Sequence, residues 1–176
     1  MNEDHLNNVI DAMESYRATK WDQFPDLDLY MDQVITYLRQ QLEFFHDSPE
    51  DNLITHSIIN NYVKGGLLER PVKKKYAKSH LARLAMACLL KRVMPMERVK
   101  KILRAEESPT DKASYESFCR MHEEVLGEEA AALREYANRE DPPKALELAT
   151  RYALKANTDR LIADRILESV KSEYGE

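Results

Sequence analysis

Apolar residues recur mostly at three- and four-residue spacings along the 176 residues of this chain, and it contains only four glycines and seven prolines. This spacing predicts a mainly helical protein, because three to four residues complete one turn of an α-helix. Breaks are predicted at Gly127 and at Asn157-Thr158. We expect helices over 4–17, 28–45, 55–64, 79–93, 96–103, 111–126, 128–138 and 144–155, and a last one from 159 to near Tyr174.

Local signals set several of these boundaries. Thr55 is a candidate N-cap, and Gly65-Gly66 is a typical helix end, so the helix between them is short. The following segment, 67–75, contains Pro71 and predicts a loop or a small β-hairpin. Ser79 is expected to cap the next helix, and Pro95 to end that helix and start another.

The apolar faces of the two longer helices in the first half predict the core. In each case the apolar residues fall on one side of the helix. The expected inner residues are Leu29, Val34, Leu38, Leu42 and Phe45 in the first helix, and Leu81, Leu84, Ala85, Cys88 and Leu89 in the second.

Composition describes a soluble globular chain, with 43% hydrophobic and 32% charged residues. No apolar run approaches the roughly 20 residues that a membrane helix needs, so we expect no membrane contact. The first sixteen residues are acidic and amphipathic, unlike a secretory signal. These features predict a cytoplasmic protein.

Charge is distributed very unevenly. Residues 54–104 hold thirteen Lys or Arg against two acids, a net of +11, inside a chain of net charge −5. The remainder therefore carries −16. A dense basic segment on an acidic body is typical of a protein that binds a polyanion.

The short helix that ends at Gly65 presents two different arcs. Ile58, Ile59, Tyr62 and Val63 fall on one side, and the opposite arc is polar. Asn can bond adenine N6 and N7 together, and Lys can reach guanine or phosphate, so this polar arc suits base recognition in a major groove. The polar residues are Ser57, Asn60, Asn61 and Lys64.

Positive charge follows this helix closely, in a loop that suits contact with phosphates. Tyr62 is a further candidate, because its hydroxyl can reach a phosphate from the edge of the helix. The expected backbone-contacting residues are Tyr62, Lys73, Lys74, Lys75 and Lys78.

Residues 55–68, followed by Lys74-Lys75-Tyr76 and 81–84, resemble the winged helix-turn-helix of MerR-type regulators. In that family a recognition helix ends in a Tyr and a Gly-Leu-Leu turn, and a basic wing, a Tyr and another helix follow. The matching positions are Tyr62, Gly66, Leu67, Leu68, Tyr76 and Leu81. This chain departs from the family where Asn60 and Asn61 replace the usual Arg-Tyr and Lys74 replaces the wing Arg.

Residues 21–103 are more closely similar to the uncharacterised bacterial family called domain of unknown function 1836. The similarity includes 28–34 and 59–64, and it implies a MerR-like DNA-binding fold without an established activity. We therefore expect a mainly α protein with three parts: an N-terminal helix over 1–20, a MerR-like winged helix-turn-helix domain with a small β wing over 21–105, and an acidic C-terminal helical region over 106–176.

Other kinds of chemistry have little support in the sequence. Cys119, His122 and Glu123 share a helix face, but no second pair of metal ligands accompanies them, so we expect no metal. Cys88 is expected to be a small buried apolar residue, and no disulfide is predicted. No phosphate loop, activated serine or dinucleotide motif is present, so we expect neither an enzyme nor a cofactor.

These features favour a sequence-specific regulator of transcription that binds double-stranded DNA. The apolar stripe Tyr115, Phe118, Met121, His122 and Val125 either completes the core or pairs with a second copy, and we expect a homodimer. An alternative is a protein-interaction adaptor that keeps the winged fold and binds an acidic protein surface, including that of its own acidic half, through the basic face.

Overall fold

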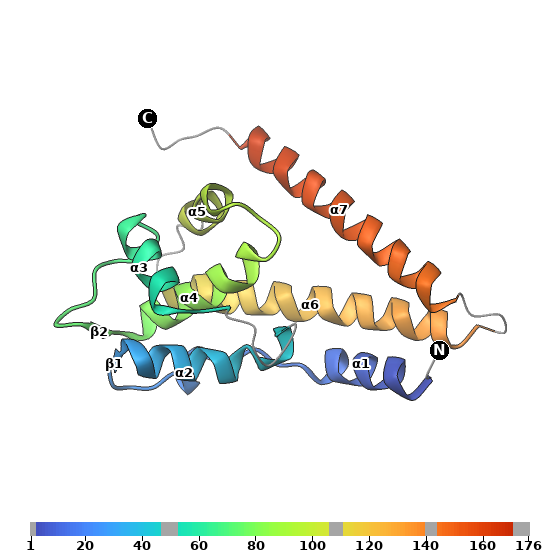
Figure 1. The fold of residues 1–176 in the computed structure, drawn as a ribbon, viewed down its shortest axis with the longest axis horizontal. Coiled ribbons are helices and arrows are strands. Elements are labelled where there is room, and N and C mark those ends of the chain that lie inside the picture. Colours follow the sequence, from blue (N-terminus) through green and yellow to red (C-terminus); the bar gives the residue numbers. More distant parts are fainter. Residues whose placement is uncertain (1–2, 47–52, 106–110, 140–143, 171–176) are drawn as a thin grey trace. The chain divides into compact units, whose positions relative to one another are not determined.

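The computed structural model describes residues 3–46, 53–105, 111–139 and 144–170 of the chain (Figure 1). Over these residues the predicted mainly helical fold is confirmed, with one small antiparallel sheet of two strands. The elements in chain order are α1 (Glu3–Ser15), the 3-10 helix η1 (Trp21–Gln23), β1 (Leu29–Tyr30), α2 (Met31–Gln41), the 3-10 helix η2 (Glu43–Phe45), α3 (His56–Lys64), β2 (Lys75–Tyr76), α4 (Lys78–Lys91), α5 (Met96–Ala105), α6 (Asp111–Ala137) and α7 (Ala145–Ser169).

The chain folds into two compact units. The central unit is Ala18–Phe118, and the flanking unit combines Met1–Arg17 with Cys119–Glu176. These divisions differ from the three predicted parts, because the first and last segments of the chain belong to one unit. Helix α6 contributes to both units, with its residues up to Phe118 in the central one.

Helix α4 forms the middle of the central unit. Four of the five residues of its predicted inner face are buried and Leu89 is partly covered. Ala82, Met86 and Ala87 are buried as well, so the helix is covered on nearly all sides. It contacts α2, α5 and β2. The fully or almost fully buried side chains of this core include Val34, Leu38, Ile54, Ile59, Leu81, Leu84 and Val99.

An aromatic cluster extends this core to the first turns of α6. The Tyr115 ring lies 5.0 Å from the Phe24 ring and 6.3 Å from the Trp21 ring, between centroids. The Tyr115 hydroxyl also donates a hydrogen bond to the Thr19 carbonyl at 2.8 Å. Tyr115 therefore completes the core, whereas Met121 and Val125 of the same predicted stripe are 54% and 51% exposed.

Helix α3 begins and ends as predicted. Thr55 is the N-cap, and its hydroxyl accepts a hydrogen bond from the Ile58 N–H at 3.2 Å. At the other end, Gly66 N–H donates to the Val63 carbonyl at 3.1 Å, and Leu67 N–H donates to the Tyr62 carbonyl at 2.9 Å. This pair of bonds is a Schellman motif, and it requires the positive φ of 70° that Gly66 adopts.

The predicted helix over 28–45 is shorter in the structure. Leu29 and Tyr30 form β1, which pairs with Tyr76 and Lys75 of β2, and the helix itself begins at Met31 and ends at Gln41. The partner strand lies 45 residues away in the sequence, so local periodicity carried no sign of it. The predicted cap at Ser79 was also wrong. The N-cap of α4 is Ala77, whose N–H donates to His80 Nδ1 at 3.1 Å.

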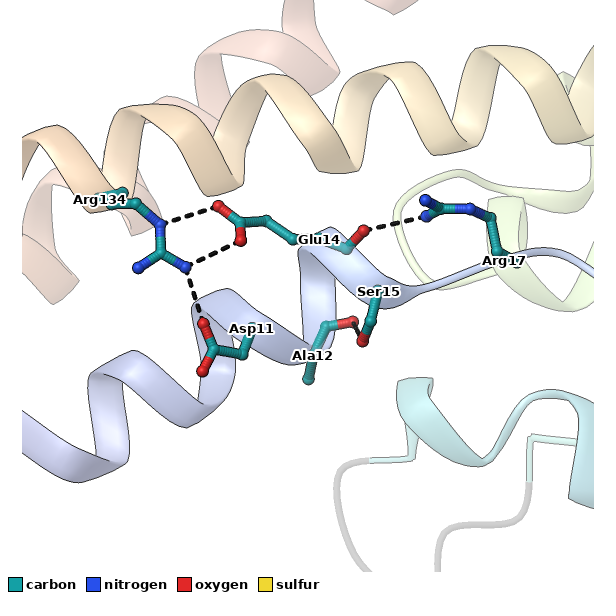
Figure 2. Close-up of polar contacts among 6 residues, drawn as sticks. All are labelled: Asp11, Ala12, Glu14, Ser15, Arg17 and Arg134. Carbon is teal, nitrogen blue, oxygen red and sulfur yellow. Dashed lines mark hydrogen bonds and ion pairs between the residues drawn. The ribbon is translucent and has the colours of Figure 1, made fainter.

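The flanking unit has its own small core. Ile10 of α1 and Leu148 of α7 pack with Ala130 and Leu133 of α6. Beside this core, Arg134 binds the Glu14 carboxylate with two nitrogens, at 2.9 and 2.8 Å, and contacts Asp11 Oδ1 at 2.7 Å (Figure 2). The hydrogen bond from Arg134 lowers the pKa of Glu14.

Two predicted helix breaks are absent from this unit. Helix α6 continues through Gly127, and α7 continues through Asn157 and Thr158. Both helices are long enough for one residue of low helix propensity to be tolerated within them. The predicted helix end near Tyr174 lies outside the described residues.

The two glycines in helical context predict opposite effects of alanine. Gly66→Ala should lower the free energy of unfolding by about 1 kcal/mol, because a Cβ disfavours the positive φ. Gly127→Ala should raise it by about 0.5–1 kcal/mol, because Gly127 lies inside α6 and an added Cβ meets nothing within 4 Å. Urea unfolding followed by circular dichroism measures both. A stabilising Gly66→Ala would contradict the Schellman geometry.

Candidate nucleic-acid interface

The two arcs predicted for α3 are confirmed by its burial. Ile59 is fully buried and Tyr62 is 6% exposed, while Ile58 and Val63 are partly covered. On the opposite side, all four residues of the predicted polar arc are exposed. That arc is called the α3 polar face below, and it consists of Ser57, Asn60, Asn61 and Lys64.

The side-chain amides of Asn60 and Asn61 make no hydrogen bond with another described residue. They are therefore not explained as internal caps of α3, whose last turn is closed by backbone bonds. Each amide offers a donor and an acceptor side by side to a partner outside the chain.

Tyr62 does not belong to the exposed surface. It lies in the core of the central unit, and burial raises the pKa of its hydroxyl to about 12. Tyr62 also takes part in the Schellman motif, where its carbonyl accepts a hydrogen bond from the Leu67 N–H. Both of these side chains are buried. This burial argues against the predicted contact of the Tyr62 hydroxyl with a phosphate.

A tight turn carries two of the predicted lysines. Val72 and Lys75 form an antiparallel bridge, and Lys75 N–H donates to the Val72 carbonyl at 2.9 Å. The two residues between them, Lys73 and Lys74, have φ of 51° and 65° and are exposed. Positive φ at both central positions is typical of a type I′ turn, where Asn-Gly is the preferred sequence. The predicted small hairpin is thus present as a two-residue turn.

The other two predicted lysines have partners within the central unit. Lys75 lies over the ring of Tyr30, with Nζ 5.2 Å from the ring centroid. Lys78 Nζ lies 2.6 Å from Asp26 Oδ1, and this hydrogen bond lowers the pKa of Asp26. Lys73 and Lys74 are therefore the more accessible of the four.

Side chains from other helices lie at both ends of α3, and neither was predicted from the sequence. At its first residue, His56 Nε2 lies 2.6 Å from Asp32 Oδ1, which joins the beginnings of α2 and α3. At its other end, Lys100 of α5 is so close to Gly65 that an added Cβ would lie 3.4 Å from Nζ. A cation at this end is favourable for the helix dipole. No local sequence motif predicts that these side chains meet, because Asp32 and His56 are 24 residues apart and Gly65 and Lys100 are 35 residues apart.

Other candidate chemistry is limited in the part of the chain that the structure describes. Cys88 is buried as predicted, burial raises its thiol pKa to about 12, and neither cysteine forms a disulfide. Across the described ranges, no group of three or more His, Cys, Asp or Glu is placed to hold a metal ion. Among these residues no helix is both long and apolar enough to cross a membrane.

Taken together, the chain is a mainly helical protein whose central unit presents a polar helix face and an exposed lysine turn. It belongs to the family described as domain of unknown function (DUF1836), whose model matches residues 19–124. The match covers the central unit and extends a short way along α6. Comparisons with curated proteins and with solved structures gave no match.

Proposed function

We propose that this protein is a sequence-specific regulator of transcription that binds double-stranded DNA through a MerR-like winged helix-turn-helix in the central unit. In this proposal α2 and α3 are the helix-turn-helix, and the turn at Lys73-Lys74 is the tip of the wing. Helices α4 and α5 follow in the order of the MerR-type domain. The α3 polar face enters the major groove, and the turn contacts the backbone.

The observation that carries the proposal is the lysine pair at positive φ. A residue with a Cβ costs about 1–2 kcal/mol in this conformation, and a turn with Asn-Gly would avoid that cost. Strained backbone positions persist mainly where function requires them. Two adjacent exposed ammonium groups at the tip of a turn suit phosphate binding.

Three further features support the choice of duplex DNA as the partner. The α3 polar face is the width of one helix, which a major groove admits, and its asparagines match the hydrogen-bonding edge of adenine. The basic segment of +11 lies in a chain of −5, so a polyanion would be attracted to the central unit. The acidic remainder would be repelled by the duplex.

Fluorescence anisotropy with a random-sequence duplex tests DNA binding directly. Four exposed cations lie between the last residue of α3 and β2, and neutralising four phosphates gives a log-log salt slope of about −3.6. These cations are Lys64, Arg70, Lys73 and Lys74. A folded sample that does not bind at about 50 mM salt would show the proposal to be wrong, and would favour an acidic protein surface as the partner of the basic face.

The α3 polar face predicts a loss of sequence preference. After selection of a preferred site from a random library, Asn60→Ala with Asn61→Ala should reduce discrimination against random duplex by about 1–3 kcal/mol for each bidentate amide–base pair that is removed. Binding to random duplex should change little. The affinity ratio between the selected and random duplexes is the measurement.

The chain contains a matched control for this experiment. Asn7 and Asn8 are also adjacent, exposed and helical, but they lie in α1 of the flanking unit. Asn7→Ala with Asn8→Ala should leave both affinities unchanged. Equal discrimination by the Asn60/Asn61 variant and the wild type would mean that another surface reads the bases.

A further inference from the structure

The small sheet places three side chains in one row across its outer face. Tyr30 of β1 is opposite Lys75 of β2, and Lys75 is in turn opposite Val72. Residues directly opposite each other in antiparallel strands point to the same side of the sheet. The neighbouring pair, Leu29 and Tyr76, points to the other side, where Tyr76 is only 2% exposed.

Two of the three side chains on this outer face are exposed hydrophobic residues. Tyr30 is 53% exposed and Val72 is 70% exposed, and the Lys75 ammonium lies over the Tyr30 ring. Neither Tyr30 nor Val72 contributes to the buried core of the central unit. The three residues Tyr30, Val72 and Lys75 are called the wing face below.

The backbone of Tyr30 is held in place by hydrogen bonds on both sides of the residue. Tyr30 is the N-cap of α2, and its N–H donates to Gln33 Oε1 at 2.9 Å. Its neighbour Leu29 pairs with Tyr76 in the same two-stranded sheet. An aromatic side chain held in this way loses little conformational entropy when it binds a partner.

We propose that the wing face is a second contact surface for duplex DNA, on which the Tyr30 ring and the Val72 side chain pack against deoxyribose rings. This inference rests on the function proposed above. The sugar is the apolar part of the nucleic-acid backbone, and every sugar is flanked by phosphates. The wing face has the matching arrangement, because Lys73, Lys74 and Lys75 lie beside its two apolar side chains along the turn and strand.

The surroundings of the wing face are compatible with a polyanion. Two nearby carboxylates already have partners within the chain: Asp26 is paired with Lys78, and Asp32 Oδ1 lies 2.6 Å from His56 Nε2. The second pair also connects the wing face to the α3 polar face. Tyr30 leads directly into α2, and Asp32 in its first turn contacts the residue that precedes Ser57.

The test measures the affinity of the full-length chain for a fluorescent random-sequence duplex at several salt concentrations. Tyr30→Ala should weaken binding by about five- to tenfold, because the variant has no ring to cover the sugar. The salt slope should stay the same, because every phosphate-binding cation is kept. Tyr30→Phe keeps the ring and should bind within about twofold of the wild type.

The contribution of Val72 to DNA binding can be tested against a second exposed valine, Val93, as a matched control. Val72→Ala should weaken binding by about twofold or more, whereas Val93→Ala should have no effect. Val93 is 54% exposed and belongs to the connection between α4 and α5, not to the sheet. Equal effects of the two valine changes would overturn the proposal.

Two results with Tyr30 would also overturn it. Unchanged affinity of Tyr30→Ala would show that the ring does not meet DNA. A salt slope flatter by about 0.9 would show that Tyr30 acts only by holding Lys75 in place. Absence of DNA binding by the wild-type chain would overturn the proposed function and the wing face together. The two results with Tyr30→Ala, in contrast, would overturn the wing face alone.

Cross-linking provides a measurement that does not depend on the alanine variants. If Tyr30→Ala does not fold, the wild-type chain and Tyr30→Phe can be irradiated with a duplex that carries a photoreactive diazirine on its sugar–phosphate backbone, and the linked peptides identified. The wing face predicts cross-links at Tyr30 in the wild type and at the same position in Tyr30→Phe. Cross-links confined to α3 would overturn it.

Discussion

Replacing Ile59 with alanine is expected to lower the free energy of unfolding of the central unit by about 2–5 kcal/mol. Ile59 is fully buried, so the change removes apolar packing and leaves a cavity on the core side of α3, which contacts α2. Urea unfolding monitored by circular dichroism measures the effect. The result matters for the site because Ile59 anchors α3 with its polar face outward.

The adjacent residue is a control of the same type on the same helix. Ile58 is only partly buried, so Ile58→Ala should cost less than about 1.5 kcal/mol. A difference of this size between neighbouring isoleucines reports which side of α3 faces the core. Equal destabilisation would mean that the helix is rotated and that the α3 polar face is assigned incorrectly.

Replacing Lys73 with asparagine and Lys74 with glycine is expected to stabilise the protein while weakening DNA binding. Stability should rise by about 1–2 kcal/mol, because Asn-Gly adopts positive φ with less strain. The salt slope should become flatter by about 1.8, which corresponds to binding about 30-fold weaker at 0.15 M salt. The two measurements are urea unfolding and duplex anisotropy.

Lys20→Gln with Lys144→Gln is the control for charge alone. Both lysines are exposed, and neither lies in the basic turn, so this variant should keep the affinity and the salt slope. Reduced stability of the Asn-Gly variant would contradict the turn geometry. Higher stability with unchanged DNA binding would support the turn and remove its lysines from the proposed interface.

The residues of α3 show which parts of a site the sequence can predict. Thr55 and Gly65-Gly66 act on the backbone within a few residues, so the ends of the helix follow from local chemistry. The alternation of Ile59 and Tyr62 with the asparagines then fixes which side is buried. The identity of a bound partner does not follow from these local rules.

Contacts between distant segments were beyond local prediction. The pairing of β1 with β2 joins residues at least 45 positions apart. If this pairing is not known, the local pattern places Tyr30 in the first turn of a helix. The same limitation concealed the partners of Lys75 and Lys78. Conversely, the helix breaks predicted at Gly127 and Asn157 are absent. The length and packing of α6 and α7 outweigh the low helix propensity of single residues.

The flanking unit is assembled from both ends of the chain, and this gives the two units different positions in the order of folding. Arg134 meets Glu14 across 120 residues, and Ile10 packs with Leu148. During synthesis, α1 leaves the ribosome before the central unit does, and its apolar side is covered only after α6 and α7 have been made. The central unit is one continuous segment, so it can fold before α7 has been made. Helix α1 then packs against α6 and α7 as the last step.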